Sequence, residues 1–306
     1  MLDGTRISNV PTASFQMSSR IASSAASTTV SDELRVESWI AEQAERTASE
    51  DWLTAISARY PEAVQTWTDP AAQIRLLKHD TNFLKSAESL PWSELLDGER
   101  LKILDFGAGT GWLSLLLSRY PSVEEITVLD SDRSNLETML PRMASLFGGE
   151  IGKLRPVVGR FSPLLVPDGY FDLIVESSAI HHAESLSELL SELKRALRPG
   201  GYLVLVNETV LPDWMLMAIA ISRALKIVRS VLAKRWQPNA PAISATTVVT
   251  DPFLGDRAYC SWQWEQALRA AGFDAKAVPT PFHTYNVGKQ SERTRLVNFI
   301  CRRPLV

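Results

Sequence analysis

Three glycines stand close together in a loop that follows an apolar run and precedes a helical pattern. The loop Gly107-Ala108-Gly109-Thr110-Gly111 comes directly after residues 103–106. Glycines let the backbone turn tightly and let a ligand approach the main chain. Asp105 stands at the mouth of this loop, and Asp130 ends the next apolar run, residues 127–129. A carboxylate in the second position can accept both hydroxyl protons of a ribose, so the spacing predicts a nucleoside site.

The charge of Asp105 separates two kinds of nucleoside ligand. A dinucleotide fingerprint, G-x-G-x-x-G, holds a pyrophosphate at a helix N-terminus. Here the third glycine comes one residue early, and Trp112 takes its place. A carboxylate would repel a pyrophosphate but attract the ammonium and sulfonium groups of S-adenosylmethionine (SAM). The charge of Asp105 therefore favours SAM over a dinucleotide as the ligand. Asp130 could bind the ribose of either ligand. Its alternative role is to cap the helix that begins near Ser134.

Four motifs in this order resemble the class I SAM-dependent methyltransferases, within their large group of small-molecule enzymes. The motifs are LDFGAGTG at 104–111, VLD at 128–130, FDLIV at 171–175 and LKRALRPGGYL at 193–203. The resemblance extends over residues 102–207 and implies a Rossmann-like, mostly parallel, doubly wound α/β sheet with an antiparallel last strand. It places Asp105 and Gly107 at the methionine end of SAM and Asp130 at the ribose. The expected cofactor-binding residues are Asp105, Gly107, Ala108, Gly109, Thr110, Gly111, Asp130, Ser131, Arg160, Phe161 and Glu176.

The chain departs from this family after the third predicted strand. Such enzymes often carry an acid there that touches the adenine amine, whereas this chain has Arg160. We therefore expect backbone groups of residues 159–162 to bind adenine, with Phe161 stacked on the ring.

The reaction site should lie beyond the carboxyl ends of the strands, as in other open α/β sheets. Methyl transfer from a sulfonium is an in-line displacement that needs alignment and desolvation, and a hydroxyl nucleophile also benefits from a base. Glu176, His181 and His182 follow the fourth predicted strand. An imidazole titrates near neutral pH, so one of the two adjacent histidines is the expected base. A structural or cofactor-shaping role for them, and a buried hydrogen-bonding role for Glu176, are the alternatives.

Apolar runs alternate with amphipathic helices from residue 101 onward, which is typical of βα units and a parallel sheet. Predicted strands cover 101–106, 126–129, 154–159, 171–176, 202–207, 275–278 and 295–301. Predicted helices cover 112–119, 134–147, 185–197, 214–235 and 261–271.

Three parts are expected along the chain. Residues 1–30 are rich in Ser, Thr and Ala and predict a disordered extension, with only a slight likeness to a transit peptide. Residues 31–98 predict a helical N-terminal cap, with helices starting at Ser31 and covering 50–59 and 71–83. Residues 99–306 form the SAM-binding domain, with a helical lid insertion over about 212–240.

The lid segment carries only basic charges between 214 and 235: Arg223, Lys226, Arg229, Lys234 and Arg235. Three interpretations are open: a solvated basic face, a lid over an apolar or anionic substrate, and an interfacial membrane helix that makes anionic contacts through Arg223, Lys226 and Arg229. Trp214, Tyr259 and Trp262 are expected in the substrate pocket, because flat aromatic side chains suit a lipophilic small molecule.

Composition narrows the class of protein. The chain has 306 residues and a net charge of −3, which gives no overall attraction to nucleic acid. Cys260 and Cys301 form no disulfide or zinc pattern, the four histidines suggest no metal, and a cytoplasmic protein with reduced thiols is expected. SAM-dependent O-methylation of a lipophilic or natural-product-like small molecule is favoured over N- or C-methylation. The alternatives are a non-methylating reaction such as cyclisation, or a non-catalytic partner subunit.

Overall fold

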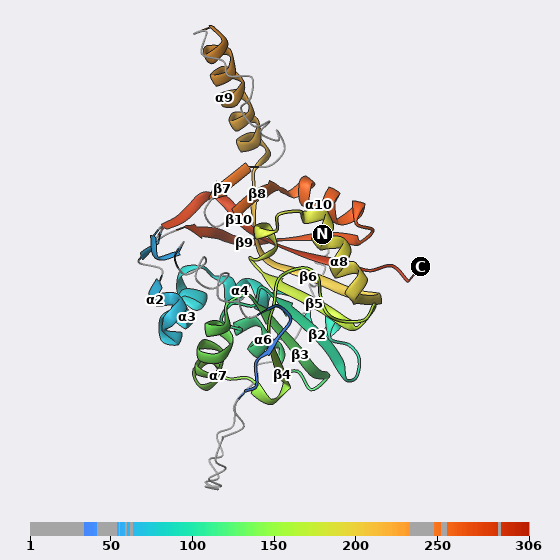
Figure 1. Cartoon of the computed structure of the whole chain (residues 1–306). Helices are drawn as coiled ribbons and strands as arrows, with labels where there is room; N and C mark the ends of the chain where they lie inside the picture. The colour runs from blue at the N-terminus through green and yellow to red at the C-terminus, as the bar shows by residue number, and fades with distance from the viewer. Residues whose placement is uncertain are drawn as a thin grey trace, which may run out of the picture. The chain divides into compact units, whose positions relative to one another are not determined.

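Five parallel strands form the centre of the sheet in the order β4-β3-β2-β5-β6 (Figure 1). The computed structural model describes residues 34–41, 54, 56–58, 60–61, 64–232, 248–251, 256–286 and 289–305. Two antiparallel strands, β10 and β9, continue the sheet beyond β6. The strands are β2 (Leu101–Phe106), β3 (Val123–Asp130), β4 (Leu154–Val158), β5 (Phe171–Ser177), β6 (Leu197–Leu211), β9 (Asp274–Asn286) and β10 (Lys289–Arg302). The predicted Rossmann-like α/β sheet with an antiparallel last strand is confirmed.

The central strands are apolar on both faces because both faces of the sheet are covered. Ile103 and Leu104 are fully buried neighbours on β2. Successive side chains of a strand point to opposite faces, and accordingly Ile103 belongs to one hydrophobic cluster and Leu104 to the other. This double burial explains the continuous apolar runs that predicted the strands.

Helices cover the two faces at the positions that the helical spacing predicts. In α8 (Leu186–Ala196) the residues Leu189, Leu190 and Leu193 are buried, and the Ser185 hydroxyl caps the helix by accepting the Glu188 N–H at 3.4 Å. The other helices of this part are α6 (Trp112–Leu117), η3 (Asn135–Met139), α7 (Leu140–Phe147), η4 (Ile151–Lys153), η5 (Ile180–His182) and α10 (Ser261–Ala270).

The segment predicted to start the helical cap is instead a strand. Glu37–Ser38 forms β1, which pairs with β4 in parallel. Arg155 on β4 donates two hydrogen bonds to the Glu37 carboxylate, at 2.7 and 2.8 Å. The helical prediction for this segment was wrong because β4 would otherwise be an unpaired sheet edge, and edge pairing outweighs local propensity.

Short helices follow β1 in the described part of the chain, whereas the predicted helix over 50–59 lies largely outside the described residues. They are α2 (Val64–Thr68), α3 (Pro70–Arg75), η2 (Leu76–Asp80), α4 (Phe83–Glu88) and α5 (Trp92–Leu95). Leu77, Leu84 and Trp92 belong to the same hydrophobic cluster as Ile103. The described part of the cap therefore shares the core of the sheet.

Two strands that the sequence analysis did not predict lie near the end of β6. β6 runs to Leu211 and pairs there with β8 (Asp256–Cys260), which also pairs with β7 (Val248–Asp251). Between β6 and β7 lies α9 (Asp213–Leu232), which confirms a long helix, while residues 233–240 of the predicted lid and the extension 1–30 lie outside the described residues. No helix in the described part of the chain has both the length and the hydropathy needed to cross a bilayer.

Candidate functional site

A cavity of about 630 Å³ opens at the carboxyl ends of the parallel strands. This is the edge at which open α/β sheets bind their ligands. The predicted site residues that line it are Gly107, Ala108, Gly109, Thr110, Asp130, Ser131, Arg160, Phe161 and His182. Asp105, Gly111, Glu176 and His181 are not among the lining residues.

The glycine loop can form only with glycines. Gly107 and Gly111 have φ angles of 61° and 74°, in the left-handed region. A Cβ atom at Gly107 would lie 2.6 Å from the Ala179 Cβ, and one at Gly111 would lie 2.3 Å from the Leu140 Cδ1. The first glycine keeps the cavity floor open, and the last lets α6 pack closely on α7.

Asp105 lies beneath the loop and not at its mouth. Its side chain is buried, and one carboxylate oxygen accepts the Ser114 N–H at 3.0 Å and the Ser114 hydroxyl at 2.6 Å. Burial raises its pKa to about 7, against the lowering effect of the Ser114 hydrogen bonds. Asp105 therefore ties the end of β2 to α6 and holds the glycine loop between them. The predicted direct contact with a cationic ligand group is corrected.

Asp130 lines the cavity. Its Oδ2 accepts the Gly109 N–H at 2.7 Å, and its Oδ1 accepts the Asp132 N–H at 2.8 Å and the Asn135 amide at 3.4 Å. A carboxylate oxygen accepts about two hydrogen bonds, so Oδ2 can still accept one from a ligand hydroxyl. The helix-capping role belongs to Asp132, which accepts the Ser134 N–H at 2.9 Å.

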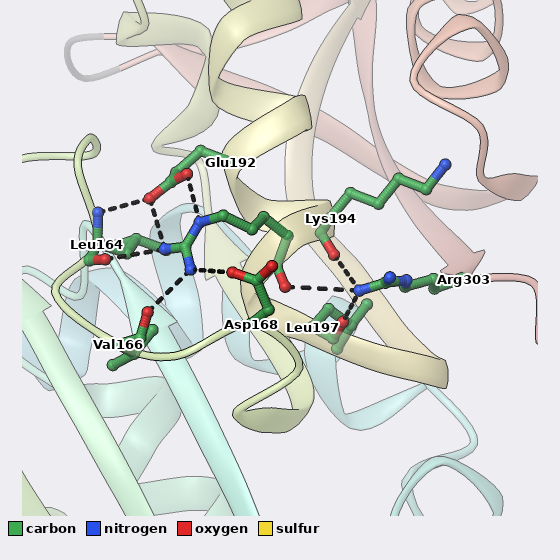
Figure 2. A network of polar contacts seen from close by, with 8 residues as sticks. Leu164, Val166, Asp168, Glu192, Lys194, Leu197 and Arg303 are labelled. Carbon is green, nitrogen blue, oxygen red and sulfur yellow. Dashed lines mark hydrogen bonds and ion pairs between the residues drawn. The ribbon is translucent and has the colours of Figure 1, made fainter.

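Arg160 and Phe161 line the cavity on a loop that α8 holds in place. The Phe161 ring packs edge-on against Phe106, with 5.4 Å between ring centroids. Farther along this loop, Arg195 of α8 donates to the carbonyl of Leu164 at 2.9 Å and that of Val166 at 2.8 Å (Figure 2). Arg195 also pairs with Asp168 and Glu192, each at 2.8 Å, and Glu192 accepts the Leu164 N–H at 2.8 Å.

Arg195 should therefore support ligand binding from outside the cavity. We expect Arg195→Ala to weaken SAM binding about fivefold, because losing the charged hydrogen bonds to the loop costs on the order of 1 kcal/mol. Arg198→Ala is the matched control, since Arg198 pairs with Asp172 of β5 and not with the loop. Calorimetric titration of both variants checks this, and equal affinities would contradict it.

Two histidine–carboxylate pairs lie side by side, one at the cavity wall and the other behind it. His182 lines the cavity, and its Nδ1 is 3.0 Å from the Asp256 Oδ1. The His181 Nδ1 is 3.1 Å from the Glu208 Oε2, and the two imidazole rings are 4.3 Å apart. Of the two adjacent histidines, the one with access to the cavity is His182.

Glu176 shapes the loop that carries both histidines. It is fully buried, and its Oε2 accepts the Ala179 N–H at 2.7 Å and the Ile180 N–H at 3.3 Å. Burial and the nearby charge of Glu208 raise the pKa of Glu176 well above its usual range. Burial raises the pKa of Glu208 to about 8. Burial lowers the pKa of His181, so this imidazole is neutral at pH 7. Glu176 thus has the buried hydrogen-bonding role.

Residues 104–205 match a protein family described as methyltransferase domain. This match covers about a third of the chain, so this region resembles a methyltransferase domain. A malonyl-[acyl-carrier protein] O-methyltransferase from Paenibacillus sp. (strain JDR-2) is 30% identical over 173 residues, which cover 56% of this chain and 55% of that protein. A ubiquinone/menaquinone biosynthesis C-methyltransferase from Vibrio parahaemolyticus is 31% identical over 106 residues, covering 35% of this chain and 40% of that protein. The chain thus spans about half, or less, of the length of these curated relatives.

A solved methyltransferase structure has the same fold. It is the 1,6-didemethyltoxoflavin-N1-methyltransferase of Burkholderia thailandensis, with bound S-adenosylhomocysteine. The TM-score is 0.50 at 17% identity, and the alignment covers 85% of this chain and 91% of that chain.

The residues that line the cavity fit SAM. Asp130 offers an acceptor oxygen for a ribose hydroxyl, and Phe161 offers an aromatic ring for adenine. The Thr110 hydroxyl is buried at the cavity without a hydrogen-bond partner among the described residues, which leaves it available for a polar ligand group. Added side chains at the glycines would fill this cradle.

The cavity and its surroundings also contain residues that the sequence analysis missed. Glu208 stands at the carboxyl end of a parallel strand, and the rule that selected Glu176 would have found it. Asp256 had no sequence signal. With His181 and His182 it forms a group whose ligand atoms lie within 4.8 Å of one another, so these three could hold a metal ion. Further missed lining residues are Trp67, Phe83, Asn135, Ser177, Ser178, Glu184, Glu188 and Leu189.

The predicted aromatic substrate pocket is corrected. None of Trp214, Tyr259 and Trp262 lines the cavity. Trp214 and Trp262 are 54% and 46% exposed, and Tyr259 packs on Trp264. Among the described residues, α9, which carries Trp214, contributes no lining residue, and neither do the parts of β8 and α10 that carry Tyr259 and Trp262. Trp67 and Phe83 supply the aromatic wall instead.

Proposed function

We propose that this protein transfers the methyl group of SAM to a hydroxyl oxygen of a small, largely apolar molecule. The observation that carries the proposal is the His182–Asp256 pair on the wall of the cofactor cavity. Trp67, Phe83 and Leu189 line the same cavity and favour an apolar acceptor. The names of the two relatives, one an O- and one a C-methyltransferase, support methyl transfer but leave the acceptor atom open.

The residues of the chain supply alignment and a base. SAM contributes an electrophilic methyl group when bound. His182 takes the hydroxyl proton at Nε2, while the Asp256 carboxylate on the Nδ1 side fixes the ring and stabilises the imidazolium that forms. Neutral His181 adds no positive charge beside that imidazolium. The apolar wall keeps water away from the nucleophile.

The wider organisation belongs to the same proposal. A disordered extension over 1–30, a methyltransferase domain over 99–306 and a cytoplasmic location stay predictions. So does the helical cap over 31–98, except that Glu37–Ser38 forms a strand. So does a small-molecule acceptor without nucleic acid.

Calorimetric titration with SAM tests the cofactor half of the proposal. We expect Asp130→Ala to weaken binding about tenfold, because a hydrogen bond from a hydroxyl to a buried carboxylate contributes about 1.4 kcal/mol or more. Asp132→Ala is the matched control, since Asp132 does not line the cavity. NAD should not bind. If the folded wild-type protein does not bind SAM, the alternative of a non-catalytic partner subunit is favoured.

Product mass tests the chemical half. With SAM and a panel of hydroxylated apolar acceptors, a product heavier by one methyl group and an equal amount of S-adenosylhomocysteine are expected. A product of unchanged mass would indicate a rearrangement or cyclisation instead.

A further inference from the structure

One face of α9 leaves five large apolar side chains in solvent. Trp214, Met217, Ile221, Leu225 and Val228 are 52 to 64% exposed. Their spacing of three and four residues places them in one stripe along the helix. We call these five residues the α9 stripe.

The opposite side of the helix anchors it to the domain. Met215 and Ile219 pack against the buried cluster of Leu211, Ala258 and Cys260 at the ends of β6 and β8. The α9 stripe is therefore a second apolar face, on a helix whose first apolar face already packs against the domain. A surface helix with a single core contact would carry polar residues there.

The stripe is unusual for this chain. Only nine large apolar side chains are strongly exposed among the described residues, and five of them form the stripe. Scattered apolar residues need no explanation, whereas a contiguous exposed patch marks a contact surface. The partner must offer an apolar surface about as long as the helix.

Charge identifies the partner. After Asp213, every ionisable residue up to position 235 is basic: Arg223, Lys226, Arg229, Lys234 and Arg235. A second copy of the chain would bring two such segments together, and their like charges would repel. An anionic lipid surface attracts them and also offers an apolar layer just below its headgroups. We propose that α9 binds the surface of an anionic lipid membrane, with the α9 stripe inserted at the boundary of headgroups and acyl chains.

This surface is connected to the reaction site. β8 anchors α9 through Ala258 and Cys260, and Arg257 of the same strand donates to the His182 carbonyl at 3.3 Å and the Ala183 carbonyl at 2.6 Å. A membrane at α9 would place the cavity close to apolar acceptors dissolved in lipid. That consequence rests on the proposed function, whereas lipid binding itself does not.

Co-sedimentation of the full chain with vesicles tests the proposal, without SAM or acceptor. One set of vesicles contains phosphatidylcholine alone, and the other also contains phosphatidylglycerol. We expect the protein to sediment with the anionic vesicles and to be released by high salt. Ile221→Glu should weaken this binding at least about tenfold, because an inserted apolar side chain becomes an acid facing anionic lipid. Leu146→Glu is the matched control, since Leu146 is 61% exposed on α7.

Three results would overturn the proposal. The wild-type protein could stay in the supernatant with both kinds of vesicle, or Ile221→Glu could bind as tightly as Leu146→Glu. Analytical ultracentrifugation could also reveal a dimer that Ile221→Glu dissociates while vesicles do not bind, in which case a second copy covers the stripe. Because both substituted positions are exposed, thermal unfolding should show that each variant folds like the wild type.

Discussion

Replacing His182 by Gln should lower kcat by about two to four orders of magnitude, the usual contribution of a general base. SAM affinity should stay within about twofold, because the loop backbone and Asp130 are unchanged. Asp256→Asn should have a smaller effect in the same direction, since the ring loses its orienting carboxylate and not its proton acceptor. Steady-state kinetics with separate kcat and KM values measure this. His79→Gln, at an exposed histidine on η2, is the matched control.

Two outcomes would contradict this role of His182. If His181→Gln removes activity while His182→Gln does not, the base is the imidazole paired with Glu208. If a chelator abolishes activity and a divalent metal restores it, the group of His181, His182 and Asp256 acts by holding a metal ion. A base alone predicts no effect of chelation.

The stability of Glu208→Gln relative to the wild type should change steeply with pH. The pKa of Glu208 is raised to about 8 in the folded protein, so the folded state holds a proton that the unfolded chain loses near pH 4.5. Between these values the unfolded state binds fewer protons, and the free energy of unfolding therefore falls as pH rises. Below about pH 4.5 the group is protonated in both states and this loss is absent.

Glutamine resembles the protonated acid at every pH and carries no such penalty. The variant should match the wild type near pH 5 and gain on it by at most about 1.4 kcal/mol per pH unit up to pH 8. Urea unfolding at several pH values measures the difference in the free energy of unfolding, in which the contributions of titrating groups distant from Glu208 cancel. A difference that does not vary with pH would mean that Glu208 is ionised throughout as an ion pair with His181. Glu124→Gln, at an exposed carboxylate paired with Arg100, is the control.

Local sequence patterns were enough to predict the sheet and the glycine loop, and to select Asp130 as a cavity residue. Strand and helix signals are local: a buried parallel strand needs a continuous apolar run, and a covering helix needs apolar residues at helical spacing. The loop conformation is local too, because Gly107 and Gly111 adopt left-handed φ angles that other residues avoid. Asp130 could be placed because a residue at the end of a predicted parallel strand faces the ligand edge.

The directions of side chains and the contacts between distant residues depend on the packing of the whole domain. Asp105 turns under the loop because Ser114 satisfies its carboxylate there, which a strand pattern does not encode. β1 exists because β4 offered an open edge. Asp256 meets His182 through the pairing of β8 with β6. Whether the aromatic rings of the α9 region reach the cavity depends on the packing of Met215 and Ile219 on one small cluster. Such contacts join residues distant in sequence, so no local periodicity records them.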